Sequence, residues 1–213
     1  RVKEPDVDDY KKLTWTMRYL RGTTDMPLTL ESDNISIIKW WVDASYAVHP
    51  DMKSHTGGMM TLGKGTTYGA STKQKLNTKS STEAELVGVN DLMPQVLWTR
   101  YFLEAQGYDV TGSIIYKDNQ SAMMLEKNGR GSSSKRTRHI NIRYFFVADR
   151  IAAGEVKAEY CPTGDMLADF FTKPLQGSTF RKFWDQILNL SPTRQPDPAP
   201  QRRDHRSVLS KRS

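Results

Sequence analysis

The chain has 213 residues, of which 37% are hydrophobic and 26% are charged, and its formal net charge is +7. This composition excludes an intrinsically disordered chain, and no apolar run approaches the roughly 20 residues that a membrane-spanning helix needs. The single cysteine, Cys161, excludes an internal disulfide bond and a zinc site built from several cysteines.

The first segment predicts a helix, because Leu13, Met17 and Leu20 repeat at helical spacing and Gly22 can end it. The chain starts at Arg1 without an initiator methionine. No charged-then-apolar leader opens it, so no secretory signal is visible. We therefore expect this helix to be the last element of something upstream, and the chain to be a fragment of a longer intracellular polypeptide.

Short runs of apolar and β-branched residues then predict strands. A short strand is expected at residues 28–30, a strong buried strand at 35–47, and further strands at 56–62 and 66–71. The last two are separated by a turn at Gly63-Lys64-Gly65. Three strands with short connections indicate an antiparallel meander.

A long helix is expected next. Residues 80–83, with the sequence SSTE, resemble a capping box, in which a serine hydroxyl satisfies a free amide of the first turn. The helix should run to about Ala105 and end at Gly107, with Pro94 bending or breaking it midway.

The rest of the chain alternates between helices and strands. We expect a strand at 114–118, helices at 119–127 and 137–153, a strand at 156–161, and helices at 165–173 and 180–190. A meander followed by this alternation predicts an α/β fold, with a mixed sheet covered by helices. Residues 191–213 hold four prolines and six Lys or Arg against two Asp, so we expect a disordered basic tail.

Four acidic residues occupy positions where burial of a charge is costly. Asp43 and Asp118 end apolar strands, Glu85 lies on the apolar face of the long helix, and Asp169 lies on a late helix. Buried carboxylates need partners, and two divalent cations would supply them together with catalysis on phosphates. Plainer alternatives are a solvated strand end for Asp43, a helix cap for Asp118 and a salt bridge from Asp169 to Lys173.

Helical phase separates Glu85 from its neighbour Glu83. At about 100° per residue, Glu85 shares a stripe with Val89, Leu92 and Val96, whereas Glu83 lies on another side and has a capping role available. Glu85 is therefore the candidate for the acidic cluster.

A cationic stretch lies between the third and fourth acids. Residues 127–143 hold six Lys or Arg and no acid. Such a stretch is usually a solvated surface, but beside an acidic catalytic cluster it fits a wall that holds phosphates.

Seven short blocks occur in order over about residues 36–190. They are VDASYA (42–47), SHTGG (54–58), STKQK (71–75), SSTEAEL (80–86), YKDNQSA (116–122), RHINIRYFF (138–146) and ADFFTKPL (168–175). This ordered set resembles the ribonuclease H domain of copia-type retrotransposon Pol polyproteins. Residues 1–30, with MRYLRGT at 17–23, look like the end of the preceding reverse transcriptase domain.

The resemblance implies a ribonuclease H-like fold: a mixed five-stranded sheet, three antiparallel strands followed by parallel strands, flanked by helices. It divides the chain into the end of the reverse transcriptase domain (1–30), a ribonuclease H-like domain (36–175), a C-terminal helix (176–190) and the tail (191–213). It also implies a catalytic site that binds two Mg²⁺ ions, with Mn²⁺ as a substitute. The residues on the matching motif positions are Asp43, Glu85, Asp118 and Asp169.

The implied activity is cleavage of the RNA strand of RNA–DNA hybrids during reverse transcription, in a cytoplasmic virus-like particle or in the nucleus. The upstream reverse transcriptase domain would be a partner within the same polyprotein. One cation would activate water and the other would stabilise the departing 3′ oxygen. The candidate substrate-binding residues are Ser80, Ser81, Thr82, Asn119, Lys73, Arg138 and His139. Further candidates for backbone contacts are Lys75, Lys79, Arg136 and Arg143.

Two alternatives stay open at this level. His139 could contact substrate, pack structurally or act in catalysis, and the stretch before Asp169 lacks the histidine that many cellular ribonucleases H place there. The alternative to an active nuclease is an inactive or weakly active nucleic-acid-binding remnant of a decayed element. An integrase or resolvase of the same fold would instead present three carboxylates at different spacing, without the SSTE block.

Overall fold

The structure, a computed structural model, describes residues 4–128 and 138–190, and at 127, 128 and 138–144 it describes the backbone alone. Its centre is a five-stranded sheet in the order β5-β3-β2-β6-β7. The strands are β2 (Ile37–Ser45), β3 (His55–Thr61), β5 (Tyr68–Lys73), β6 (Gly112–Lys117) and β7 (Val156–Tyr160). β2, β3 and β5 pair antiparallel, whereas β6 runs parallel to both β2 and β7. The predicted mixed sheet of the ribonuclease H-like fold is confirmed.

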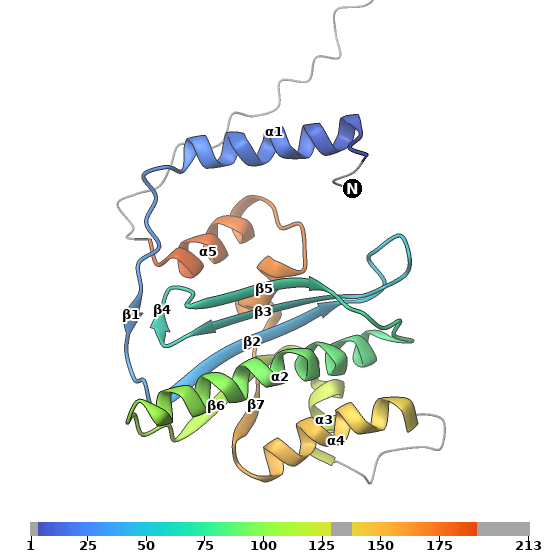
Figure 1. Cartoon of the computed structure of the whole chain (residues 1–213), viewed down its shortest axis with the longest axis vertical. Coiled ribbons are helices and arrows are strands. Elements are labelled where there is room, and N and C mark those ends of the chain that lie inside the picture. Colours follow the sequence, from blue (N-terminus) through green and yellow to red (C-terminus); the bar gives the residue numbers. More distant parts are fainter. Residues whose placement is uncertain (1–3, 129–137, 191–213) are drawn as a thin grey trace, which may run out of the picture.

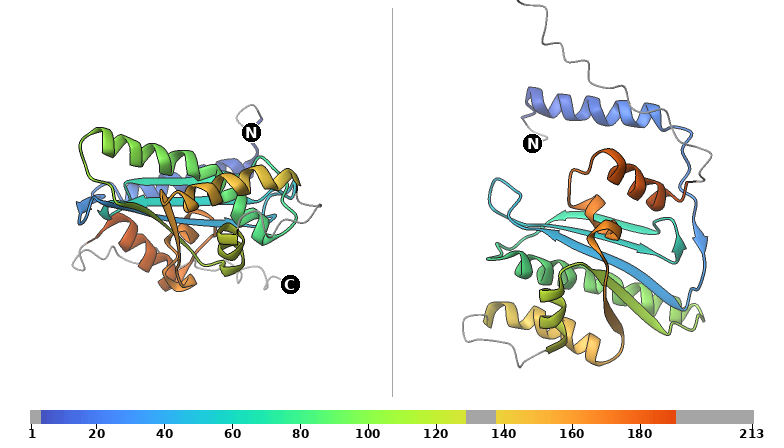
Figure 2. Two further views of the ribbon diagram at one scale, coloured as in Figure 1. Left: turned by 90° about the horizontal axis from the view of Figure 1, so that it is seen from below. Right: turned by 180° about the vertical axis from the view of Figure 1, so that it is seen from behind.

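Helices cover both faces of this sheet (Figures 1 and 2). On one face lie α2 (Ser81–Ala105) and α4 (Arg138–Ala152), with α3 (Gln120–Asn128) beside them. On the other lie two short 3₁₀ turns, η3 (Thr163–Asp165) and η4 (Leu167–Phe171), and the helix α5 (Gly177–Leu188).

Alternation along the strands supplies a separate core to each face. Ile38, Trp40 and Val42 of β2 pack with the α2 stripe, which includes Val89 and Val96. On the opposite face Met59 of β3 packs with Leu167, Phe183 and Ile187 from η4 and α5. The central strands β2 and β3 are therefore buried on both sides, and an acid on either face of them lacks bulk solvent.

The long helix α2 is continuous through Pro94, so the expected break is wrong. Pro94 lies on the exposed side, where water can replace the bond that it cannot donate to the Asn90 carbonyl. Leu92, Met93 and Val96 on either side are buried in one core, and this packing outweighs the local cost.

Two other expectations need correction. Residues 165–173 form not one helix but the turns η3 and η4, separated at Met166, whose ψ of 87° is not helical. The expected strand at 28–30 lies instead at Glu31–Ser32 (β1), and it pairs with Gly63–Lys64 (β4), where a turn was expected. Lys64 forms an ion pair with Glu31 at 2.9 Å across this small ladder.

The first helix, α1 (Val7–Gly22), lies apart from the sheet and above α5 (Figure 1). None of its residues is buried, and its contact with α5 includes a hydrogen bond from Trp184 Nε1 to the Tyr19 hydroxyl at 3.2 Å. Within the described residues, no helix is both long and apolar enough to cross a membrane.

A buried ion pair joins the end of β6 to α3. Lys117 Nζ lies 2.6 Å from Glu126 Oε1, and the two side chains are 0% and 1% exposed. Removing one partner leaves the other charge buried and unpaired, whereas removing both leaves an apolar contact.

We expect Lys117→Met to lower the free energy of unfolding by about 3–5 kcal/mol, and Lys117→Met/Glu126→Leu to recover most of that loss. Urea unfolding, with both single variants and the double variant, measures this. A double variant no more stable than the worse single variant would contradict the pairing.

Candidate metal centre

Three aspartates from different parts of the chain converge at one end of the sheet. Asp43 lies on β2, Asp118 directly follows β6, and Asp169 lies on η4. One carboxylate oxygen of each lies within 4.8 Å of those of the other two. β2 and β6 are parallel and pair Trp41 with Tyr116, so each aspartate lies two residues further along its strand. The parallel pairing therefore brings the first two acids together.

The third acid reaches the cluster because η4 lies very close to β3. A Cβ atom on Gly57 would be 2.6 Å from Thr172 Cγ2 and 2.7 Å from the Ala168 carbonyl oxygen. A Cβ on Gly69 would be 2.9 Å from the Phe171 ring. Gly57 is required here, because a side chain would meet the backbone of η4 and push Asp169 away from the other acids, whereas Gly69 leaves room for the Phe171 ring.

Burial and mutual repulsion determine the charge state of Asp169. Burial raises the pKa of Asp169 to about 6; Lys173 opposes this rise and the charge of Asp43 adds to it. Lys173 Nζ lies 2.7 Å from Asp169 Oδ1 and 3.6 Å from Asp43 Oδ2. Burial alone would lower the pKa of Lys173, but the neighbouring acids raise it overall. The salt bridge considered for Asp169 is thus present, and it brings a cation to the edge of the acidic cluster.

Glu85 approaches from α2, on the other face of the sheet. Its Oε1 accepts a hydrogen bond from the Ala44 amide at 3.1 Å, and it is 4% exposed. Its Oε2 is buried and has no hydrogen-bond partner among the described residues. Burial raises the pKa of Glu85 to about 8; Lys117 opposes this rise, and Asp43 and Asp118 add to it. Glu85 lies outside the group of three oxygens but within their electrostatic field.

This set of residues fits a divalent cation. Magnesium prefers carboxylate oxygens, and a cation would satisfy the unpartnered oxygen of Glu85 and offset the repulsion among the aspartates. The fit rests on the chemistry of these donors.

Glu83 has the capping role that helical phase suggested. Ser80 Oγ accepts a hydrogen bond from the Glu83 amide at 3.2 Å, and Glu83 Oε2 accepts one from the Lys79 amide at 2.7 Å. The first turn of α2 is therefore closed by Glu83, and Glu85 remains directed toward the acids.

At the end of β6 the structure assigns the cap of α3 to Asn119 rather than to Asp118. Asn119 Oδ1 accepts a hydrogen bond from the Ala122 amide at 3.0 Å and so caps α3. Asp118 Oδ2 instead accepts one from Thr163 Oγ1 at 3.1 Å. The capping role considered for Asp118 thus falls to Asn119.

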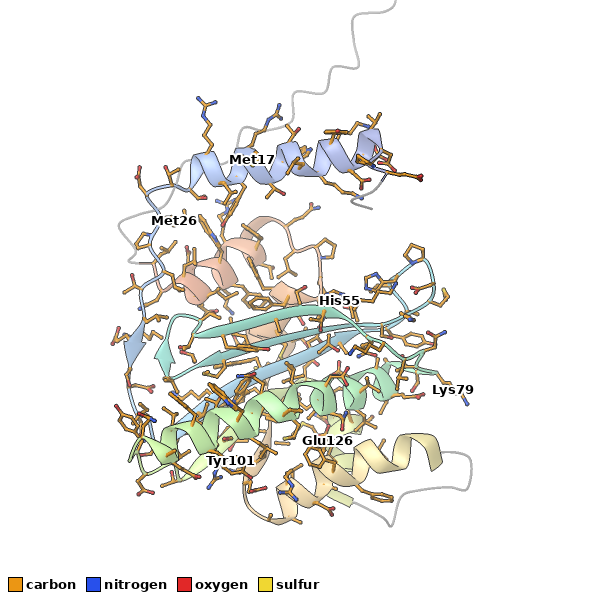
Figure 3. The ribbon with its side chains drawn as sticks, in the orientation of Figure 1. Met17, Met26, His55, Lys79, Tyr101 and Glu126 are labelled. Carbon is orange, nitrogen blue, oxygen red and sulfur yellow. The ribbon has the colours of Figure 1, made fainter. Side chains whose placement is uncertain are left out.

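The structure describes Ser81, Thr82, Lys73 and Lys79 among the other predicted substrate residues, and their role in binding stays a prediction. Ser81 and Thr82 open α2, and Lys79 extends outward just ahead of it (Figure 3). Lys73 is paired with Asp51 at 2.8 Å. The side chains of Arg138 and His139 lie outside the described residues, as do those of Arg136 and Arg143 and the whole of residues 191–213.

Sequence reasoning missed Thr172 and Thr163. Thr172 Oγ1 donates a hydrogen bond to Asp43 Oδ2. Its only signal was its position three residues after Asp169, in the same block. Thr163 had no local signal, because its partner, Asp118, is 45 positions away.

Comparison with known proteins identifies relatives of this chain. It is 31% identical over 180 residues to the retrovirus-related Pol polyprotein from transposon TNT 1-94 of Nicotiana tabacum, covering 84% of this chain. It is 32% identical over 185 residues to that from transposon RE2 of Arabidopsis thaliana, covering 86% of this chain. The chain is a homologue of retrotransposon Pol polyproteins. It spans only 13% of either relative, and the predicted copia-type resemblance is confirmed.

No family model matches the chain. Among solved structures, ribonuclease H1 of Halobacterium salinarum matches 60% of this chain and 86% of its own, at 12% identity and a TM-score of 0.40. The structure of LC11-RNase H1 in complex with an RNA/DNA hybrid matches 59% of this chain and 86% of its own chain, at 11% identity and a TM-score of 0.42.

The raised pKa of Glu85 predicts that the free energy of unfolding of the metal-free protein depends on pH. Between pH 4.5 and about 8, folded Glu85 retains a proton that the unfolded chain has lost, so the free energy of unfolding falls as pH rises through this window. Glu85→Gln removes that dependence. We expect the variant to be more stable than the parent by roughly 2–4 kcal/mol at pH 8.5 in EDTA.

Thermal or urea unfolding at pH 5 and pH 8.5 measures this difference. The two proteins should be close in stability at pH 5. A parent that is as stable as the variant at both pH values would show that Glu85 is ionised without cost.

Proposed function

We propose that this Pol segment is a metal-dependent endonuclease that cleaves the RNA strand of RNA–DNA hybrids during reverse transcription. The observation that carries this proposal is the cluster of Asp43, Asp118 and Asp169, two of them buried, beside the buried Glu85 with one oxygen unpartnered. So many buried acids are costly in a purely structural module, whereas a two-metal phosphodiester hydrolase needs them.

Asp43, on the central strand β2, would help to hold both cations. Glu85 and Asp118 would complete one site, and Asp169 the other. Mg²⁺ fits these oxygen donors, and Mn²⁺ could substitute for it. When bound, two such cations offset the charge of the phosphate, activate water and stabilise the leaving 3′ oxygen.

Hydrogen bonds from neighbouring groups, each to one carboxylate oxygen, hold three of these acids in place. The Ala44 amide orients Glu85, Thr172 orients Asp43, and Thr163 orients Asp118. Lys173 offsets the charge of Asp169 before cations arrive, and its half-exposed ammonium is then free to contact a phosphate oxygen.

Recognition of RNA requires groups that read its 2′ hydroxyl. Ser81 and Thr82 are suited to this, because the Ser80 hydroxyl already caps α2. The Asn119 amide group keeps its N–H donors, since only its oxygen caps α3. Lys73, Lys75 and Lys79, together with Arg138 and His139, would contact the backbone of the hybrid.

The homologous polyproteins extend far beyond this segment, and we propose that a reverse transcriptase domain precedes it. The exposed helix α1 would then belong to the junction between the two. The setting would be a virus-like particle or the nucleus, where reverse transcription takes place.

The decisive experiment is incubation of the chain with a labelled RNA–DNA hybrid, in Mg²⁺ and in EDTA. Asp43→Asn should lower cleavage by at least about 10²-fold, because the shared ligand of both cations is lost. Asp91→Asn, at an exposed position on α2, is the matched control and should cleave as the parent does.

Cleavage of the hybrid but not of single-stranded RNA, abolished by EDTA, is the expected outcome. Binding of the hybrid without cleavage by the parent would identify a nucleic-acid-binding remnant. Full Mg²⁺-dependent activity in Asp43→Asn would remove the assignment of this centre.

A further inference from the structure

A chain of hydrogen bonds reaches the segment that carries Asp169 (residues 168–173). It approaches from β3 and β5, on the side of the segment that faces away from Asp118. Ser71 Oγ on β5 donates to the Phe171 carbonyl at 2.7 Å. His55 Nε2 lies 2.8 Å from Ser71 Oγ, and His49 Nε2 lies 3.0 Å from His55 Nδ1. Figure 3 shows His55 at the start of β3, next to the loop that joins β2 to β3. None of these groups has a part in the proposed chemistry.

The strand register places this chain of hydrogen bonds opposite Asp43. Asp43 pairs with Gly57, and Gly57 pairs with Ser71, so the three form one row across β2, β3 and β5. Cross-strand partners point to the same face of a sheet. The segment that follows Asp169 lies across this row: Thr172 bonds Asp43 at one end, Gly57 leaves room in the middle, and Ser71 bonds Phe171 at the other.

Hydrogen-bond counting fixes the direction of this chain of hydrogen bonds. A carbonyl can only accept, so the single proton of the Ser71 hydroxyl goes to Phe171, and His55 Nε2–H must donate to Ser71. In neutral His55 the Nδ1 atom is then an acceptor, and it takes its hydrogen bond from His49. Burial lowers the pKa of His55, and His49 lowers it further, which favours this neutral form.

We propose that Ser71 and His55 are positioning residues for the nuclease centre, which fix the Phe171 carbonyl and thereby the place of Asp169 and Thr172. This inference rests on the proposed function. Ser71 is exposed and His55 half-buried, so neither contributes to a hydrophobic core. Their loss should move the segment rather than unfold the protein.

The test uses the full chain with Ser71→Ala, which removes the donor, and Ser71→Thr, which keeps a hydroxyl. His55→Phe and His55→Gln form a second pair, because glutamine keeps an N–H donor. Thr72→Ala, next to Ser71 but on the opposite face of β5, is the matched control. The readouts are kcat and KM on a labelled hybrid, backbone amide NMR signals, and the line broadening that Mn²⁺ causes.

We expect Ser71→Ala and His55→Phe to lower kcat by about 10–100-fold with KM within about twofold, because the acids are misplaced while binding persists. The amide signals of residues 168–173 should shift and their broadening by Mn²⁺ should weaken. The melting temperature should change by less than about 4 °C. Ser71→Thr and His55→Gln should recover most of the activity, and Thr72→Ala should behave as the parent.

The proposal is overturned if Ser71→Ala keeps both the parent's kcat and its amide signals at 168–173, or if Thr72→Ala loses as much activity. A parent that does not cleave hybrids refutes the proposed function instead. The NMR signals and the Mn²⁺ broadening then still decide whether Ser71 and His55 position the segment.

Discussion

The repulsion among carboxylates that lie close together at one end of the sheet, largely shielded from water, is the constraint on which the rest of this structure depends. Asp43 and Asp169 are 2% and 5% exposed, and their oxygens lie with one of Asp118 inside a 4.8 Å group. At such separations the repulsion between like charges is worth several kcal/mol at the effective dielectric of a protein. The fold must hold these groups together against that repulsion, with elements that are otherwise well packed.

The chain compensates this charge in two separate ways. Lys173 lies on the rim, bonded to Asp169 and close to Asp43, and it is exposed enough to move when a cation binds. Lys117 lies beneath the site and eases the ionisation of Glu85, but Glu126 neutralises it. Lys173 is one cation beside three aspartates, and Lys117 is already paired with Glu126, so this end of the sheet stays negative overall, which favours multivalent cations over further lysines.

The sheet and the long helix could be predicted because their patterns are local. Runs of apolar and β-branched residues marked β2 and β3, the SSTE block marked the start of α2, and helical phase chose Glu85 over Glu83. The form of the Asp169 segment could not be predicted, because Gly57 and Gly69 decide it from more than 90 positions away. The same reason hides the bond from Thr172 to Asp43, whose partners are 129 residues apart.

The sequence also could not decide which of two adjacent residues caps a helix. Asp118 and Asn119 are both good caps, and only the three-dimensional position of Thr163 shows why the asparagine takes the cap. Pro94 looked like a breaker because its cost is local, whereas the packing that offsets it comes from β2 and β3.

The ion pair between Lys117 and Glu126 has a consequence for how this chain can evolve. Any lineage that replaces one of the two residues first must pass through a form with an isolated charge in its interior, directly behind the acidic centre. Selection would remove most such intermediates. The two positions should therefore be inherited together, as a linked character that identifies a lineage of these elements, even though neither residue belongs to the cluster of three aspartates.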